Sequence, residues 1–307
     1  MKISFIIPLY NCLPLTQAML ASLQATLPAG LAHEIIFVDD GSTDGTRAWL
    51  ATLPAPVRVV LNERNLGYAG ANNRGASVAT GDLLVLLNND LILTPRWLDP
   101  MLAAHRRCRG LVGNVQRDAR TGAVDHTGMW ITLQGKPAHD RVLPPWWLRL
   151  LRPVRPTVAA TGACLLVPRD LWGQLGGFDE AFRNGGEDVD LCFRARAAGH
   201  PTVIALRSII RHHVSSSPGR KLNDEANSRR LALKWRDEFA RLAARRWSWH
   251  HLEREWTGPN PAGDHAAAIQ LLAYGLYLRR TPPPSALAGM RDALDHEFAR
   301  WEKILPS

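Results

Sequence analysis

The chain has 307 residues, which is enough for one large domain with an appendage and for a sizeable buried core. The 46% apolar and 21% charged residues are ordinary for a globular protein, and no apolar run approaches the roughly 20 residues that span a bilayer. The net charge of +9 suits anionic partners such as nucleotide diphosphates, nucleic acid or anionic lipid headgroups, without choosing among them. Four dispersed cysteines disfavour a metal cluster or a disulfide framework, and we expect a cytoplasmic protein with free thiols.

Apolar runs and helical patterns alternate through the first 105 residues. Runs that predict strands cover residues 3–7, 35–38, 57–61 and 83–87, and the first and last of them predict burial. Helical patterns lie between and beside them, at residues 15–27, 43–50 and 69–79. This alternation predicts an α/β fold with a mostly parallel sheet and helices on both faces.

The rest of the chain is less regular. Residues 111–145 are rich in turn formers and predict only short strands, followed by a strand at 158–167 and a helix at 188–198. Basic helical patterns then dominate from residue 221, with a last helix ending at Trp301. We therefore expect a main domain at residues 1–220, with halves at 1–105 and 106–220. A helical C-terminal extension would follow at residues 221–307.

Four polar islands follow apolar runs or turns along the chain. They are Asp39-Asp40-Gly41-Ser42, Asn88-Asn89-Asp90, Gly186-Glu187-Asp188 and His212-His213. Ligands of open α/β sheets bind at the carboxyl ends of the strands, where such islands would meet. Oxygen-rich side chains with added imidazole indicate an enzyme that handles a metal-bound diphosphate.

Several ordered stretches resemble the family 2 inverting glycosyltransferases of the GT-A fold. They are SFIIPLYN, EIIFVDDGSTDGT, NLGYAGANNRGA, GDLLVLLNNDLILTPRWL, TGACLLVPRDLWGQLGGFDEAF and GGEDVDLCFRARAAG. The resemblance covers residues 1–105 and 157–220. It is closest to bacterial rhamnosyltransferase-like members that build cell-surface polysaccharides.

The resemblance implies a set of nucleotide-binding residues. Asp40 would bond the pyrimidine ring N–H, Asp39 would lie near the ribose, and Tyr10 would stack on the base. The remaining members of the set are Pro8, Asn11, Asn65, Gly67, Asn88 and Asn89. Turn formation alone also explains the Pro8–Asn11 and Asp39–Ser42 stretches, and for Asn65 and Gly67 the two interpretations are equal.

The family's metal motif falls on Asn88-Asn89-Asp90. Asp90 would bind Mg²⁺ or Mn²⁺ directly, whereas Asn88 stands where the family usually has an acid, which predicts weak metal binding without the diphosphate. Alignment with the family's histidine turn favours His212 over His213 as a second metal ligand. Arg220 or Lys221 would neutralise the departing diphosphate, unless each is only a solvated charge.

The resemblance assigns the chemistry to the Glu187-Asp188 pair. Asp188 would be the general base that takes the proton of the acceptor hydroxyl, with Glu187 orienting the acceptor or the loop. Acids in a first helical turn are otherwise ordinary partners of the helix dipole.

The predicted function is metal-dependent inverting transfer of a sugar from a dTDP- or UDP-linked donor, rhamnose among the candidates, to a saccharide or lipid-linked saccharide. The alternative is a catalytically inactive nucleotide-sugar-binding or scaffold protein of the same fold. No motif supports nucleic-acid binding. Peripheral contact with anionic membrane is expected at the basic helices after residue 220 or at Trp146 and Trp147 beside Arg149 and Arg152, although a solvated helical face explains the former equally well.

Overall fold

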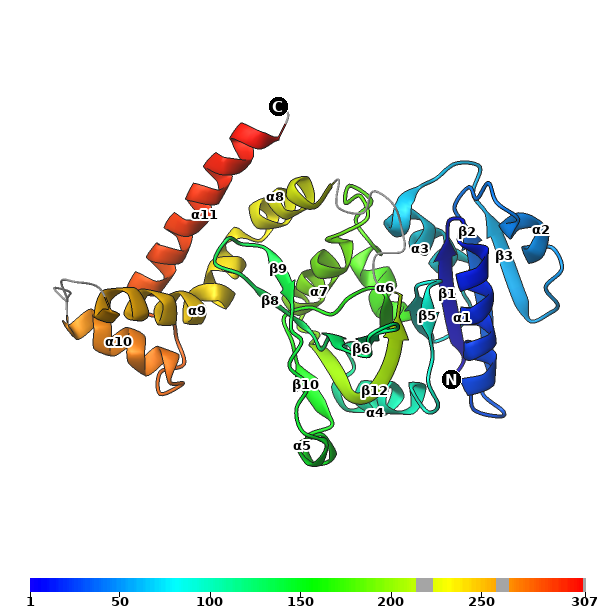
Figure 1. Cartoon of the computed structure of the whole chain (residues 1–307), viewed down its shortest axis with the longest axis horizontal. Coiled ribbons are helices and arrows are strands. Elements are labelled where there is room, and N and C mark those ends of the chain that lie inside the picture. The colour runs from blue at the N-terminus through cyan, green and yellow to red at the C-terminus, as the bar shows by residue number, and fades with distance from the viewer. Residues whose placement is uncertain (214–222, 258–264, 306–307) are drawn as a thin grey trace. The chain divides into compact units, whose positions relative to one another are not determined.

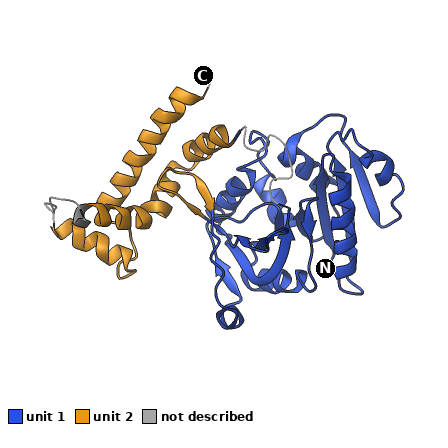
Figure 2. Ribbon diagram, viewed as in Figure 1, with its two compact units in different colours: residues 1–129, 139–223 blue, residues 130–138, 224–307 orange. Residues whose placement is uncertain are grey.

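The computed structural model describes residues 1–213, 223–257 and 265–305, and the chain divides into two compact units (Figure 2). Unit 1 comprises residues 1–129 and 139–223, and unit 2 comprises residues 130–138 and 224–307. The segment 130–138 groups with the C-terminal helices although it lies about ninety residues before them in the sequence. Neither Arg220 nor Lys221 lies within the described residues.

Unit 1 is built on a mixed sheet (Figure 1). Its strands follow the order β10-β12-β6-β11-β4-β1-β2-β3, with β5 added to β12 and β7 added to β6. β1 to β4 are parallel, whereas β11 runs antiparallel to both of its neighbours. The strands are β1 (Ile3–Leu9), β2 (His33–Asp39), β3 (Val57–Leu61), β4 (Leu83–Leu87), β5 (Leu91–Ile92), β6 (Leu111–Asp118), β7 (Val124–His126), β10 (Val154–Pro156), β11 (Cys164–Pro168) and β12 (Thr202–His212).

Helices cover both faces of this sheet. The helices of unit 1 are α1 (Leu13–Thr26), α2 (Thr46–Leu50), α3 (Gly67–Val78), α4 (Leu98–Cys108), α5 (Trp146–Leu151), α6 (Arg169–Leu175) and α7 (Glu187–Ala197). On one face, α1 and α4 bury Met19 and Met101 against Phe5 and other alternate strand residues. On the other face α3 approaches so closely that a Cβ on Gly75 would lie 2.5 Å from the Ile6 side chain. The predicted α/β class with helices on both faces is confirmed.

The predicted strand at 158–167 is wrong in its first half, since β11 begins only at Cys164. Before it, Ala159 makes an isolated antiparallel bridge with Met129, and the N–H and C=O of Gly162 bond to Asp188 and Tyr68 rather than to a neighbouring strand. Apolar character therefore marked burial correctly but not backbone pairing.

Unit 2 consists of helices and most of a short hairpin. The hairpin strands are β8 (Met129–Ile131) and β9 (Pro137–His139), and the helices are α8 (Asp224–Lys234), α9 (Arg236–Thr257), α10 (His265–Gly275) and α11 (Pro284–Ile304). A separate small core joins α9, α10 and α11 through Ala244, Leu252, Leu271 and Ala286. Among the helices that the structure describes, none is both long and apolar enough to cross a membrane.

Candidate active site

Two of the polar islands lie at one edge of the sheet, at the ends of β2 and β4. Strand register places Leu9 at the end of β1 opposite Asp39 at the end of β2, and β4 runs parallel to β1 on its other side. The fourth island arrives from the far part of the chain, because β12 pairs with β5 and sets His212 opposite Leu91. The sheet therefore gathers the residues that the sequence places at strand ends.

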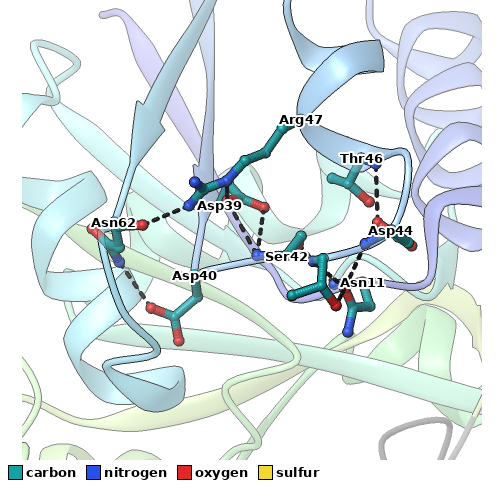
Figure 3. Close-up of polar contacts among 9 residues, drawn as sticks. Asn11, Asp39, Asp40, Ser42, Asp44, Thr46, Arg47 and Asn62 are labelled. Carbon is teal, nitrogen blue, oxygen red and sulfur yellow. Dashed lines mark hydrogen bonds and ion pairs between the residues drawn. The ribbon is translucent and has the colours of Figure 1, made fainter.

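The two aspartates after β2 brace neighbouring loops (Figure 3). Asp39 is fully buried and accepts hydrogen bonds from Arg47 Nε at 2.6 Å and from the backbone N–H of Ser42. Asp40 accepts from the Asn62 side chain and from the backbone N–H groups of Leu66 and Gly67, at 2.8 to 2.9 Å. The sequence did not show Arg47 as the partner of Asp39.

The loop after β1 is fixed to the loop after β2. The side-chain oxygen of Asn11 accepts from the N–H of Thr43 at 2.8 Å, and the Asn11 N–H donates to Ser42. Tyr10 beside it is 51% exposed at the strand end, so its ring is free to meet a planar ligand. Pro8 is buried within β1, which runs two residues further than the apolar run predicted.

The start of α3 carries the predicted base-side residues. Asn65 Oδ1 accepts from the N–H of Gly67 at 3.0 Å, and Gly67 has φ +78°, a conformation that favours glycine. Asn184 from the loop before α7 accepts from the N–H of Tyr68 at 3.0 Å. This bond links the predicted nucleotide side to the predicted acceptor side.

Asp90 and His212 face each other at the end of β4. Their Oδ1 and Nε2 atoms lie 3.2 Å apart and are buried, yet neither makes a hydrogen bond in the described structure. The nearby Asn88 Oδ1 is likewise buried without a hydrogen-bond partner, while Asn89 donates to Thr16 at 2.9 Å. Buried polar atoms left without partners are costly, which fits a pair waiting for a bound cation.

The choice between the two histidines follows from this geometry. The imidazole of His212 lies against the Asp90 side chain, whereas His213 meets Asp90 through its backbone N–H, which donates to the Asp90 carbonyl at 3.1 Å. His212 is therefore the imidazole that could share a cation with Asp90. Within the described ranges no third His, Cys, Asp or Glu side chain completes a metal cluster with them.

Glu187 and Asp188 open α7, as the sequence predicted. Asp188 is half-buried and accepts from the Gly162 N–H and from the Val189 N–H, both at 2.8 Å. Glu187 is buried and accepts from the N–H of Gly185 at 2.7 Å. The Asp188 carboxylate is thus partly exposed in the site, and the buried Glu187 carboxylate stabilises the loop that precedes α7.

Tyr68 and Gly162 are site residues that the sequence analysis missed. The Tyr68 hydroxyl donates to the Gly162 carbonyl at 2.8 Å, and a Cβ on Gly162 would lie 3.0 Å from that hydroxyl oxygen. Burial, reinforced by the nearby Glu187 and Asp188 charges, raises the pKa of Tyr68 well above its usual value. The phenol therefore remains a donor. Both residues lie in stretches that carry the family resemblance, but neither stretch indicates that the two residues meet.

His126 is a second missed residue. Its ring is fully buried, neither ring nitrogen has a hydrogen-bond partner within the described part of the chain, and its centroid lies 4.8 Å from that of His139. Burial is the main cause that places the pKa of His126 well below its usual value. The nearby His139, Arg155 and His212 lower this pKa further. A neutral imidazole therefore lies near the Asp90–His212 pair, and nothing in the irregular segment around it signals this.

Comparison with known proteins identifies the family. The family model described as "Glycosyl transferase family 2" matches residues 4–155. The N-acetylglucosaminyl-diphospho-decaprenol L-rhamnosyltransferase of Mycobacterium tuberculosis is 30% identical over 81% of this chain and 86% of that protein. The chain belongs to glycosyltransferase family 2. It is a glycosyltransferase, as its sequence motifs predicted.

Other relatives of this glycosyltransferase are much longer. The O-antigen biosynthesis protein RfbC of Myxococcus xanthus is 29% identical over 92% of this chain, which spans 21% of that protein. The chain likewise spans 29% of an uncharacterized protein, y4gI, of Sinorhizobium fredii, to which it is 31% identical.

Among solved structures, the mannosyltransferase PcManGT of Pyrobaculum calidifontis has a TM-score of 0.58 and 20% identity over 98% of this chain and 87% of its own. The GT-A fold expected from the motifs is confirmed.

Proposed function

We propose that this glycosyltransferase is an inverting, metal-dependent enzyme that uses a nucleotide diphospho-sugar. The donor is dTDP- or UDP-linked, with rhamnose among the candidate sugars, and the acceptor is a hydroxyl of a saccharide or lipid-linked saccharide in cell-surface polysaccharide synthesis. The buried Asp90–His212 pair carries this proposal, because two adjacent metal-capable atoms lack hydrogen bonds at the sheet edge where nucleotides bind. The relatives named above, one of them a rhamnosyltransferase, support the donor and acceptor classes.

Asp90 and His212 would hold Mg²⁺ or Mn²⁺, with Asn88 beside them. When bound, the cation supplies positive charge that stabilises the leaving nucleotide diphosphate. The donor set fits, since hard cations prefer carboxylate oxygen and accept neutral imidazole. Only two protein ligands of this kind converge in the described residues, so a diphosphate must contribute to tight binding.

The loops at the ends of β1 and β2 would hold the nucleoside. Asp40 uses three internal hydrogen bonds, while a carboxylate offers about four acceptor positions, so one remains for a ring N–H of the base. Tyr10 would stack on the base, and the backbone at Gly67 allows the ligand to approach closely. Asn11, Asn65 and Asp39 would act by fixing these loops, and Asp39 would lie near the ribose.

Asp188 would remove the acceptor proton. As the acceptor oxygen bonds to the anomeric carbon, the bond to the nucleotide diphosphate breaks on the opposite face and the hydroxyl proton passes to the Asp188 carboxylate. The Gly162 and Val189 N–H groups orient that carboxylate and stabilise its charge. Glu187 accepts a hydrogen bond from the Gly185 N–H and would orient this loop or the acceptor.

A thermal-shift panel tests the donor site. UDP, dTDP, GDP and CDP are each measured with Mn²⁺ and again with EDTA, and we expect one pyrimidine diphosphate to raise the Tm only when Mn²⁺ is present. Stabilisation by RT ln(1 + [L]/Kd) amounts to about 2.7 kcal/mol at one hundred times the Kd. If no diphosphate stabilises the protein in a metal-dependent way, the proposed donor site is wrong.

An inactive binding protein is the second candidate. It is favoured by Asn88, which stands where the family usually has an acid, and opposed by the intact Asp188, Asp90 and His212. Such a protein would bind the diphosphate with Mn²⁺ in the same panel but would release no nucleotide when offered donor and acceptor.

We place the protein at the cytoplasmic face of the membrane, with α5 as its contact. Figure 1 shows α5 on an arm beyond β10, and Trp146, Trp147, Leu150 and Leu151 are all more than half exposed there. Residues 141–169 contain arginines but no acid, which suits an anionic surface. Exposed tryptophans beside cations are typical of interfacial membrane anchors.

Removing these tryptophans tests the contact. Each buried apolar side chain contributes about 1.5–3 kcal/mol, so W146S/W147S should weaken binding to phosphatidylglycerol-containing vesicles at least about tenfold in a sedimentation assay. Leu61→Ser removes an exposed apolar side chain on β3 and serves as the matched control. Equal vesicle binding by all three proteins would exclude α5 as the anchor.

A further inference from the structure

Unit 2 contains a cavity that the transfer reaction does not use. It has a volume of about 550 Å³ and lies between α9 and the segment that includes α10 and the residues after it. Its lining combines cationic and aromatic side chains: Arg241, Arg245, Arg246, Trp249, Tyr274, Tyr277 and Arg280. All of these residues belong to unit 2, so the cavity is defined without reference to the catalytic unit.

The two lining segments carry no carboxylate. The sequence has no acid between Glu238 and Glu253, and none from residue 265 to residue 291. Glu238 is paired with Arg241 at 2.6 Å, but neither Arg245 nor Arg280 forms an ion pair within the described residues. The cavity therefore has uncompensated positive charge, which attracts an anion.

Arg245 is held in an orientation that suits an oxyanion. Its guanidinium carbon lies 4.0 Å from the Tyr274 ring centroid and 3.8 Å from that of Tyr277. Stacking uses the faces of the guanidinium and leaves the N–H groups at its edge for hydrogen bonds. One of these, Nη1, is buried without a hydrogen-bond partner among the residues that the structure describes. A prepositioned arginine with an unused donor matches the oxygens of a phosphate group.

Apolar side chains stand beside the cations. Leu276, Tyr277 and Leu278 follow α10 directly and are 51%, 77% and 79% exposed, and Trp249 on α9 is 44% exposed. Three consecutive exposed apolar residues next to Arg279 and Arg280 are unusual for a solvated surface. They would cover an apolar chain attached to the anion.

We propose that this cavity binds the phosphate or diphosphate group of an amphipathic ester, with the apolar chain lying on Leu276, Tyr277 and Leu278. Two sources share this chemistry: an anionic phospholipid of the bilayer and a prenyl diphosphate. Either would attach unit 2 to the surface on which a lipid-linked acceptor resides. The site does not depend on the proposed transfer reaction.

Binding of farnesyl diphosphate to the full chain tests the site. Calorimetry is performed in EDTA and excess UDP, so that diphosphate held through a cation or in the donor site does not contribute. R245K keeps the positive charge but loses the guanidinium fork, and R280A removes an exposed cation without altering the core. We expect the double variant R245K/R280A to raise the Kd at least tenfold, and inorganic diphosphate to bind at least tenfold more weakly than farnesyl diphosphate.

Controls separate this site from general charge effects and from the donor site. Arg254→Ala removes an exposed cation of α9 outside the cavity and should change the Kd less than twofold. The metal-dependent thermal shift with a pyrimidine diphosphate should be the same in R245K/R280A as in the parent, so failure of one proposal is distinguishable from failure of the other.

Vesicle sedimentation identifies the source of the phosphate. Vesicle binding that R245K/R280A weakens indicates a phospholipid. Farnesyl diphosphate binding that R245K/R280A weakens, with phosphatidylglycerol vesicle binding through α5 unchanged, indicates a prenyl diphosphate. Both results support the site. A farnesyl diphosphate Kd that is unchanged in R245K/R280A, or inorganic diphosphate binding as tightly as farnesyl diphosphate, would overturn it.

Discussion

Asp188→Asn is expected to lower kcat about 10²- to 10⁴-fold while leaving donor binding unchanged, because general-base catalysis contributes on this scale. The amide oxygen of asparagine can still accept the Gly162 N–H hydrogen bond that Asp188 accepts at 2.8 Å. What it cannot do is take the proton of the acceptor hydroxyl. The substitution therefore removes the chemistry and retains the Gly162 bond, although the single amide oxygen cannot also accept from the Val189 N–H, which Asp188 binds through its other oxygen.

The measurement is nucleotide release from the donor identified by the thermal-shift panel, with a lipid-linked saccharide as acceptor. Asp170→Asn is a closely matched control, because Asp170 lies in the first turn of α6 and accepts from the next backbone N–H at 2.7 Å, as Asp188 does at 2.8 Å. Both variants lose one favourable charge at a helix N-terminus, worth about 0.3–1 kcal/mol. If both lower kcat equally, helix stabilisation explains the effect and Asp188 is not the base.

The sequence predicted best what depends on local pattern. β3 and β4 begin and end at the predicted residues, because each is a short run rich in aliphatic residues between turn residues. The convergence of Asp40 and Asn88 also followed from local information, since parallel strands deliver their carboxyl ends to one edge. The placement of His212 required more: β12 reaches the edge through its antiparallel pairing with β5.

Contacts between distant segments could not be predicted from one sequence. Tyr68 meets Gly162 across 94 positions, and Asn184 meets Tyr68 across 116. Neither pair has a spacing or composition that distinguishes it from many others in the chain. For the same reason, composition does not predict that the segment 130–138 groups with the C-terminal helices.

Asp90→Asn should abolish the metal-dependent thermal shift with the donor diphosphate. Even residues that only support metal ligands contribute about 10- to 100-fold to metal affinity, so loss of a direct carboxylate ligand should cost at least about 100-fold. His212→Ala should have the same effect. His213→Ala retains the backbone N–H that bonds to the Asp90 carbonyl, and should preserve the metal-dependent shift.

The same variant distinguishes a metal site from a structural ion pair when it is measured in EDTA. Asp90 Oδ1 and His212 Nε2 lie 3.2 Å apart without a hydrogen bond, so in the metal-free protein they contribute desolvation cost rather than stability. Asparagine at position 90 lowers that cost, because it is neutral and can donate to the imidazole. The metal-free Tm of Asp90→Asn should therefore equal or exceed that of the parent. A structural ion pair predicts the opposite, since breaking a buried pair destabilises a protein by about 3–5 kcal/mol.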